Sequence, residues 1–97
     1  MTRLGELYQN QGNNEEAKKW YKKAVQKGER SALNNLAVVY LSEKNYKESE
    51  SLFLRSVKEN NFVSMRNLSE LYHVQEKYEE AEKLDINYLK LEILIEQ

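Results

Sequence analysis

The chain has 97 residues, enough for a single domain with a modest hydrophobic core. It contains no proline, no cysteine and only three glycines, which favours helices joined by short turns and excludes disulfide and thiolate chemistry. Its net charge of −1 does not provide the basic face that nucleic-acid binding usually requires. We therefore expect a small all-α protein that has no nucleic-acid partner.

The sequence repeats with a period of 32 residues. Leu36 lies 32 positions after Leu4, and Leu68 lies 32 positions after Leu36. Apolar residues three and four positions apart share one face of a helix, so the segment at each leucine predicts the first helix of a pair. The second helices align at Glu16, Glu48 and Glu80, at Trp20, Leu52 and Leu84, and at Val25, Val57 and Leu89. The chain is therefore predicted to be one domain, residues 1–97, with units at about 1–28, 29–60 and 61–97.

The first unit carries signals for a close helix contact, a cap and a stop. Glycine costs about 1 kcal/mol relative to alanine inside a helix, so Gly5 indicates that a partner helix approaches closely there. Asn13 precedes Glu16 by three residues, which is the spacing of a capping box, and Asn45 repeats the cap in the second unit. Gly28 tolerates the left-handed conformation that ends a helix, so it is predicted to close the unit.

The last helix departs from this plan. Lys77 stands at its cap position and Glu92 at the position of Gly28, so this helix is predicted to extend from about Tyr78 to near the C-terminus. Its apolar residues form one seam of Ala81, Leu84, Tyr88, Leu91 and Ile95 and a second seam of Ile86, Leu89 and Ile93. A helix that is apolar on so much of its circumference needs burial on more than one side. One hypothesis is therefore a homodimer, with self-association through Leu91, Ile93, Leu94 and Ile95.

Two families of helix-pair repeats have a pattern similar to this one. The chain resembles the tetratricopeptide repeat at Leu4, Gly5, Tyr8, Ala17, Tyr21 and Ala24. It resembles the Sel-one-like repeat at Trp20, Tyr21, Ala24, Gly28, Ala32, Asn35, Leu36 and Tyr40. The resemblance covers nearly the whole chain and is weaker in the third unit, where Asp85 replaces an aromatic residue. It implies a right-handed α-solenoid of three antiparallel helix pairs, about six helices, with the last helix extended.

The resemblance implies a binding function and no catalysis. In tetratricopeptide domains the first helices line a concave surface, which binds a peptide or protein segment. The residues expected on that surface are Arg3, Glu6, Asn34, Asn35, Val38, Leu41, Arg66, Asn67, Glu70 and His73. The alternative is that Asn35 bridges helices or meets water, and that Val38 and Leu41 pack between first helices. The carboxylate clamp of chaperone-binding members is not expected, because its positions read Thr2, Glu6, Asn35, Val63 and Asn67 and lack cations.

No motif in the sequence points to an enzyme or a cofactor. His73 is the only histidine, and Glu70 before it makes half of a di-metal motif that needs a second copy, so we expect a surface histidine and no metal. No apolar run approaches the ~20 residues of a membrane span, and the absence of a charged-then-apolar leader favours a cytoplasmic location. The leading hypothesis is a protein-interaction scaffold with a protein or peptide partner and no membrane contact. The alternative is a structural module that self-associates through its C-terminal helix.

Overall fold

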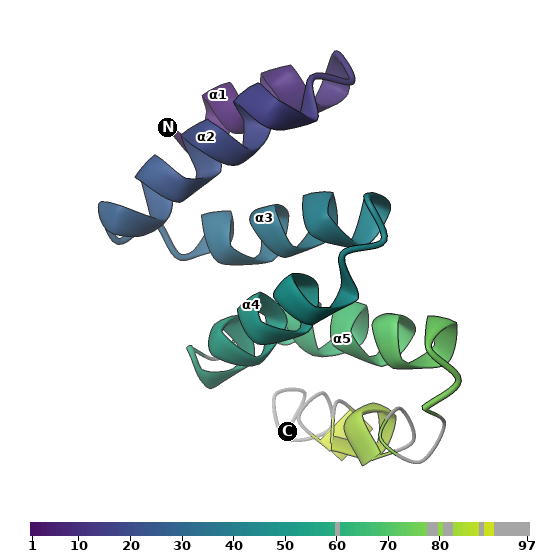
Figure 1. The fold of residues 1–97 in the computed structure, drawn as a ribbon. Helices are drawn as coiled ribbons and strands as arrows, with labels where there is room; N and C mark the ends of the chain where they lie inside the picture. The colour runs from purple at the N-terminus through teal and green to yellow at the C-terminus, as the bar shows by residue number, and fades with distance from the viewer. Residues whose placement is uncertain (60, 78–79, 81–82, 88, 91–97) are drawn as a thin grey trace.

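The structure, a computed structural model, describes residues 1–59, 61–77, 80, 83–87, 89 and 90. Five helices follow one another as α1 (Thr2–Asn10), α2 (Asn14–Gln26), α3 (Ser31–Ser42), α4 (Tyr46–Lys58) and α5 (Phe62–Val74). Residues 83–87, 89 and 90 are helical as well, and no strand occurs in the described parts of the chain. The prediction of an all-α chain built from consecutive helix pairs is confirmed (Figure 1).

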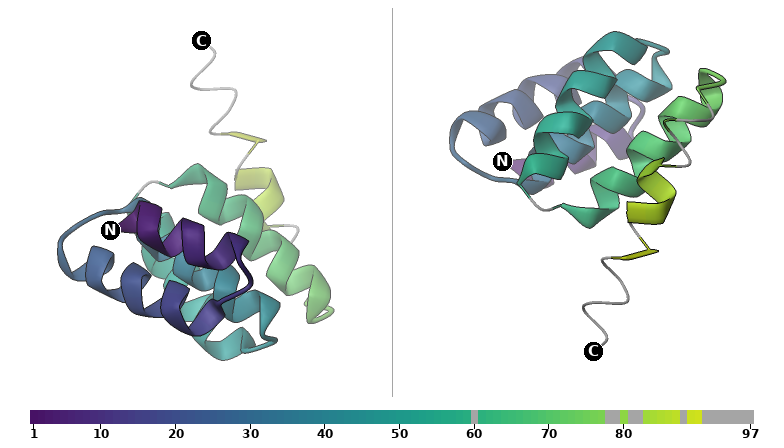
Figure 2. Two further views of the ribbon diagram at one scale, coloured as in Figure 1. Left: turned by 90° about the horizontal axis from the view of Figure 1, so that it is seen from above. Right: turned by 90° about the horizontal axis from the view of Figure 1, so that it is seen from below.

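The helices form two layers. Each helix packs on the next one along the chain, from α1 on α2 to α4 on α5, and α3 also contacts both α1 and α5. Among these five helices, α2 and α4 do not contact each other. One layer therefore contains α1, α3 and α5, which we call the first-helix layer, and the other contains α2 and α4. This is the arrangement of a helical-repeat solenoid. Figure 2 views it from its two ends, with α1 and α2 in front from above and the helical residues 83–87 in front from below.

The core consists of two apolar clusters on either side of α3. The first cluster contains Ala17, Tyr21, Ala24, Ala32, Leu36 and Val39, and the second contains Ala37, Phe53, Leu68, Leu71 and Tyr72. Leu36 and Val39 belong to the first cluster, whereas Ala37 belongs to the second. The central helix α3 is thus buried on two faces, which is why its sequence is more apolar than that of α2 or α4.

A close approach between α1 and α2 explains the glycine inside the first helix. A Cβ atom on Gly5 would lie 2.9 Å from Cζ of Tyr21 and closer still to two other atoms of the ring. Tyr21 is fully buried, and its hydroxyl donates a 2.6 Å hydrogen bond to Oε1 of Gln9. The expectation that a small residue is needed here is confirmed.

The turn inside each unit uses one left-handed residue at an aligned position. Gly12 has a φ of 77°, and Lys44 and Glu76, which follow it at intervals of 32 residues, both have a φ of 62°. Gly28 has a φ of 83° directly after the C-cap of α2, so the predicted stop is confirmed. Only the first of the three turns inside a unit has glycine, the residue that adopts this conformation without strain.

The predicted helix caps are confirmed in part. The side chain of Asn13 accepts a hydrogen bond from the backbone N–H of Glu16 at 3.3 Å. Asn45 occupies the same position at α4 but makes no side-chain cap bond, so that part of the expectation is wrong. Asn61 caps α5 by accepting from the backbone N–H of Ser64 at 3.2 Å.

The described residues of the last helix show how the third unit is held. Leu84 packs against the second cluster, and Asp85 accepts a 2.6 Å hydrogen bond from the hydroxyl of Ser69. Asp85 aligns with Tyr21 and Phe53, so a hydrogen bond replaces a buried aromatic ring at this position. Leu91, Ile93, Leu94 and Ile95, the predicted self-association residues, lie outside the described residues, as does Tyr78, where the helix was predicted to begin.

Candidate peptide-binding surface

All residues predicted to bind a peptide lie on α1, α3 or α5, and so belong to the first-helix layer. Those that are exposed are Arg3, Glu6, Arg66, Glu70 and His73. Those that are half-buried are Asn34, Asn35, Val38, Leu41 and Asn67. The structure therefore brings charged side chains to the surface of this layer and places amides and aliphatic side chains at the contacts between its helices.

Two sets of amide hydrogen bonds connect the helices of this layer. Nδ2 of Asn35 donates to Oε1 of Glu6 at 3.4 Å, which joins α3 to α1. Oδ1 of Asn34 accepts from Nδ2 of Asn67 at 3.0 Å and from Oγ of Ser64 at 2.9 Å, which joins α3 to α5. The amides thus bridge neighbouring helices, as the alternative interpretation of Asn35 stated. A carboxamide offers two donors and an acceptor with two lone pairs, so the described bonds use only part of its capacity.

Buried serines support this amide row, and the sequence analysis did not identify them. Ser64 is hydrogen-bonded to Ser56 at 2.6 Å as well as to Asn34, and both serines are almost fully buried. They align with Ala32 and Ala24 of the first repeat. The available signal was the replacement of a small apolar residue by serine, since a buried hydroxyl needs a hydrogen-bond partner nearby.

Val38 and Leu41 provide the apolar part of the layer. Both are half-buried and pack against the second core cluster. Part of each side chain is therefore buried in the fold, and the rest is exposed to solvent. Their predicted role as an apolar contact for a ligand stays a prediction.

His73 is directed toward the last helix. Its Nε2 lies 3.7 Å from Oδ2 of Asp85, and the other carboxylate oxygen of Asp85 accepts from Ser69. In a catalytic triad the histidine stands between the serine and the acid. Here Asp85 lies between Ser69 and His73, so the three residues do not have the arrangement of a catalytic triad.

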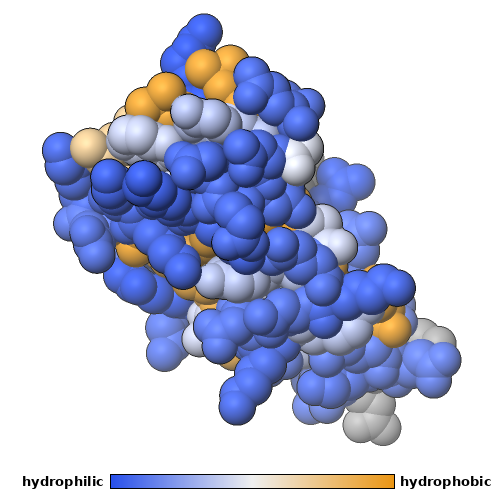
Figure 3. Space-filling model, turned by 45° about the horizontal axis from the view of Figure 1, so that its top comes forward, coloured by the Kyte–Doolittle hydropathy of each residue, from blue (hydrophilic) through white to orange (hydrophobic). Residues whose placement is uncertain are grey.

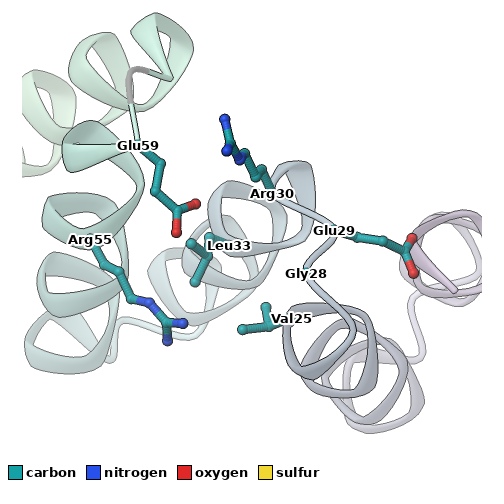
Figure 4. Close-up of a pocket in the computed structure, with 7 residues that line it drawn as sticks. All are labelled: Val25, Gly28, Glu29, Arg30, Leu33, Arg55 and Glu59. Atoms are coloured by element: carbon teal, nitrogen blue, oxygen red, sulfur yellow. The ribbon is translucent and has the colours of Figure 1, made fainter.

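A groove between α2 and α4 opens on the other layer. A cavity of about 270 Å³ is lined by Val25, Gly28, Glu29, Arg30, Leu33, Arg55 and Glu59 (Figure 4). A neighbouring cavity of about 310 Å³ shares Val25 and Arg55 with it. Glu29 points away from the other side chains, because its carboxylate accepts hydrogen bonds from the hydroxyl and the backbone N–H of Thr2. The family resemblance directed attention to the first helices, so this groove was not predicted.

None of the described helices is both long and apolar enough to cross a membrane. Two models of a family described as tetratricopeptide repeat match the chain, one over residues 1–26 and the other over residues 30–58. Together these matches cover more than half of the 97 residues and include α1 to α4. Neither match is to the Sel-one-like repeat, and a comparison with curated proteins found no match.

Proposed function

The chain belongs to the tetratricopeptide repeat family, and we propose that it is an interaction scaffold that binds a peptide or protein segment on its first-helix layer. Repeats of this family generally mediate contacts between proteins. The observation that carries the finer proposal is the row of polar side chains that crosses α1, α3 and α5. Asn35 is hydrogen-bonded to Glu6 of α1, and its neighbour in the sequence, Asn34, is hydrogen-bonded to Asn67 of α5.

An extended segment fits this row for chemical reasons. Its backbone presents N–H and C=O groups at regular intervals, and carboxamides match both kinds of group. Val38 and Leu41 supply apolar surface for a side chain of the ligand. Arg66 and Glu70 are exposed on α5 and give the surface charges of both signs, so a ligand of mixed charge is favoured over a strongly acidic or basic one.

A displayed library of random peptides tests this proposal, because it samples many ligand sequences at once. Peptides selected on the parent chain should bind Arg66→Ala about tenfold more weakly, because exposed arginines at interfaces often contribute more than 1 kcal/mol. Asn35→Ala should also weaken binding while leaving the helical content unchanged. The matched control is Arg55→Ala, which removes an exposed arginine from α4 and the opposite groove. If the selected peptides lost binding to Arg55→Ala but still bound Arg66→Ala, the site would lie on the layer of α2 and α4, and the proposal would be wrong.

Self-association through the C-terminal helix is the second candidate. Ile86 and Leu89 are 45% and 56% exposed, which favours a further contact at this end of the chain. In the sequence-based hypothesis the interface consists of Leu91, Ile93, Leu94 and Ile95. The double variant Leu91→Glu/Ile95→Glu should then be monomeric under conditions where the parent chain forms dimers in light scattering.

A further inference from the structure

Three neighbouring cavities form a continuous strip over α2 and into the groove between α2 and α4. The two cavities of the groove share Val25 and Arg55, as described above. The third, which we call the outer cavity, shares Lys22 and Gln26 with the larger groove cavity. It is lined by Glu15, Lys18, Lys19, Lys22, Lys23 and Gln26. In Figure 4, Val25 of α2 and Arg55 of α4 extend from the two walls into the groove, with Leu33 of α3 between them.

Cations outnumber carboxylates in each of these cavities. The outer cavity has four lysines and one glutamate. Glu29 points away from the groove, so each groove cavity is left with two cations and one carboxylate. These are Lys22, Arg55 and Glu48 in the larger one, and Arg30, Arg55 and Glu59 in the smaller one. The whole chain has 15 Lys and Arg residues against 16 Asp and Glu residues, so the excess of cations is local to this strip.

Lys22 and Arg55 are the cations of the groove that are best placed to bind an outside group. Both are exposed, and they line the larger groove cavity from opposite walls. Among the residues that the structure describes, neither of them forms an ion pair. Lys18 differs, because it is held by Glu43 at 2.9 Å and by Glu15 at 3.0 Å. Two unpaired cations on facing walls favour a ligand that carries negative charge.

Between these two cations the larger cavity has apolar lining. It comes from Leu36 and Tyr40 of α3, Val25 of α2 and Leu52 of α4. The cavity volume of about 310 Å³ is at the lower end of the ~300–1,000 Å³ typical of small-molecule sites, so it suits a single side chain of a protein ligand.

The surface around this cavity does not offer a broad apolar face. In Figure 1, α2 lies in front of α1 and α4 in front of α5, and Figure 3 turns the same view so that its top comes forward. The surface seen there is mainly hydrophilic, and apolar atoms come through only in small areas (Figure 3). A ligand on this side is therefore recognised by its charges together with very few apolar side chains.

We propose that the groove between α2 and α4 binds an acidic protein segment. One aliphatic or aromatic side chain of the segment lies against Leu36 and Tyr40, and its carboxylates meet Lys22 and Arg55. The lysines of the outer cavity extend the positive charge along α2, so further carboxylates on that side strengthen binding. The site lies on the opposite layer from the proposed peptide-binding surface and does not depend on it.

Nucleic acid fits the groove less well than an acidic segment does. Glu48 and Glu59 of the α4 wall would oppose a continuous row of phosphates, because like charges placed together disfavour binding. A protein segment can carry its carboxylates on the α2 side alone and present an apolar side chain to the cavity.

The test is a displayed peptide library with a fixed aliphatic or aromatic residue at its centre and Asp or Glu at half of the other positions. Peptides selected on the parent chain should bind at least about tenfold more weakly once their central residue is replaced by serine, measured by fluorescence anisotropy. The variant Lys22→Glu/Arg55→Glu should weaken binding about tenfold or more. Circular dichroism should show unchanged helical content, because both side chains are exposed.

The chain offers a matched control for this variant. Lys27→Glu/Lys47→Glu makes the same change of charge at two exposed lysines that line none of the three cavities, and it should weaken binding only slightly. Arg66→Ala should leave binding unchanged, because Arg66 lies on the first-helix layer.

Four results would overturn the proposal. A library that gives no enriched peptides on the parent chain leaves the groove without its ligand. Equal weakening by the two double variants shows a general attraction between opposite charges and no site in the groove. Single-stranded DNA that binds as tightly as the selected peptides shows a basic surface without preference for a protein segment. Peptides that lose binding to Arg66→Ala and still bind Lys22→Glu/Arg55→Glu belong to the first-helix layer.

Discussion

The contact between α1 and α2 makes Gly5→Ala a direct test of how the first helix pair is packed. In an unconstrained helix this change raises stability by about 1 kcal/mol, because alanine has the higher helix propensity. Here the new methyl group would overlap the ring of Tyr21, whose Cζ lies 2.9 Å from the position of the Cβ atom. Overpacking a core costs typically ~1–3 kcal/mol. We therefore expect a net loss of up to about 2 kcal/mol in the free energy of unfolding.

The ring has little freedom to move away from an added methyl group. Tyr21 is fully buried, and its hydroxyl is held by Gln9 at 2.6 Å. The loss of stability caused by Gly5→Ala should therefore depend on the Tyr21 ring. A double-mutant cycle with Tyr21→Leu measures this dependence. In the Tyr21→Leu background Gly5→Ala should raise the free energy of unfolding, measured by urea denaturation with circular dichroism.

The second unit supplies a matched control for this cycle. Ala37 stands at the position of Gly5 and is fully buried against the second cluster. Ala37→Gly should cost about 1 kcal/mol or more, from helix propensity together with the lost methyl contact. If Gly5→Ala stabilised the parent chain by about 1 kcal/mol, with no coupling to Tyr21→Leu, the packing argument would be refuted.

Three further predictions concern the turns, the buried tyrosine and the last helix. Lys44→Gly should raise the free energy of unfolding by up to about 1 kcal/mol in urea denaturation, because it relieves a left-handed φ of 62°, whereas Lys47→Gly inside α4 should lower it by a similar amount. Burial raises the pKa of Tyr21 from 10.0 to about 12, so the unfolded chain loses this proton at lower pH than the folded chain. Stability should therefore fall as the pH rises from about 10 to about 12, and Tyr21→Phe should show a smaller fall over this range in urea titrations. Asp85→Ala should lower the free energy of unfolding by up to about 1 kcal/mol, because it removes the hydrogen bond from Ser69, and an unchanged value would contradict that role.

The helix pairs were predictable because aligned positions, 32 residues apart, carry side chains of similar size as well as similar polarity. Leu4, Leu36 and Leu68 each begin a segment with the same spacing of apolar residues, and that spacing requires a helix with one buried face. The glycine signals at Gly5 and Gly28 were also sufficient. A glycine inside a helix is costly unless a neighbouring helix approaches closely, as α2 does at Gly5, and Gly28 supplies the left-handed φ that ends α2.

The hydrogen bonds of individual side chains were not predictable in the same way. Asn13 and Asn45 have nearly the same backbone conformation and the same glutamate three positions on, yet only Asn13 makes the cap bond. The amide bonds of Asn34 and Asn35 depend on how closely the first helices approach one another, which the period does not specify. The left-handed turn at Lys44 had no signal of its own and follows only from alignment with Gly12.

In each unit the first and second helices meet at one aligned pair of residues, and the residue types of this pair change along the chain. Gly5 faces Tyr21 in the first unit, and Ala37 shares a cluster with Phe53 in the second. In the third unit the contact is a hydrogen bond between Ser69 and Asp85.

The two kinds of contact differ in strength. Burying an aromatic ring contributes about 1.5–3 kcal/mol, whereas a hydrogen bond contributes about 1 kcal/mol, and less when its acceptor is 55% exposed, as Asp85 is. At this aligned position, residues 83–87 are therefore held less strongly than α2 or α4 are.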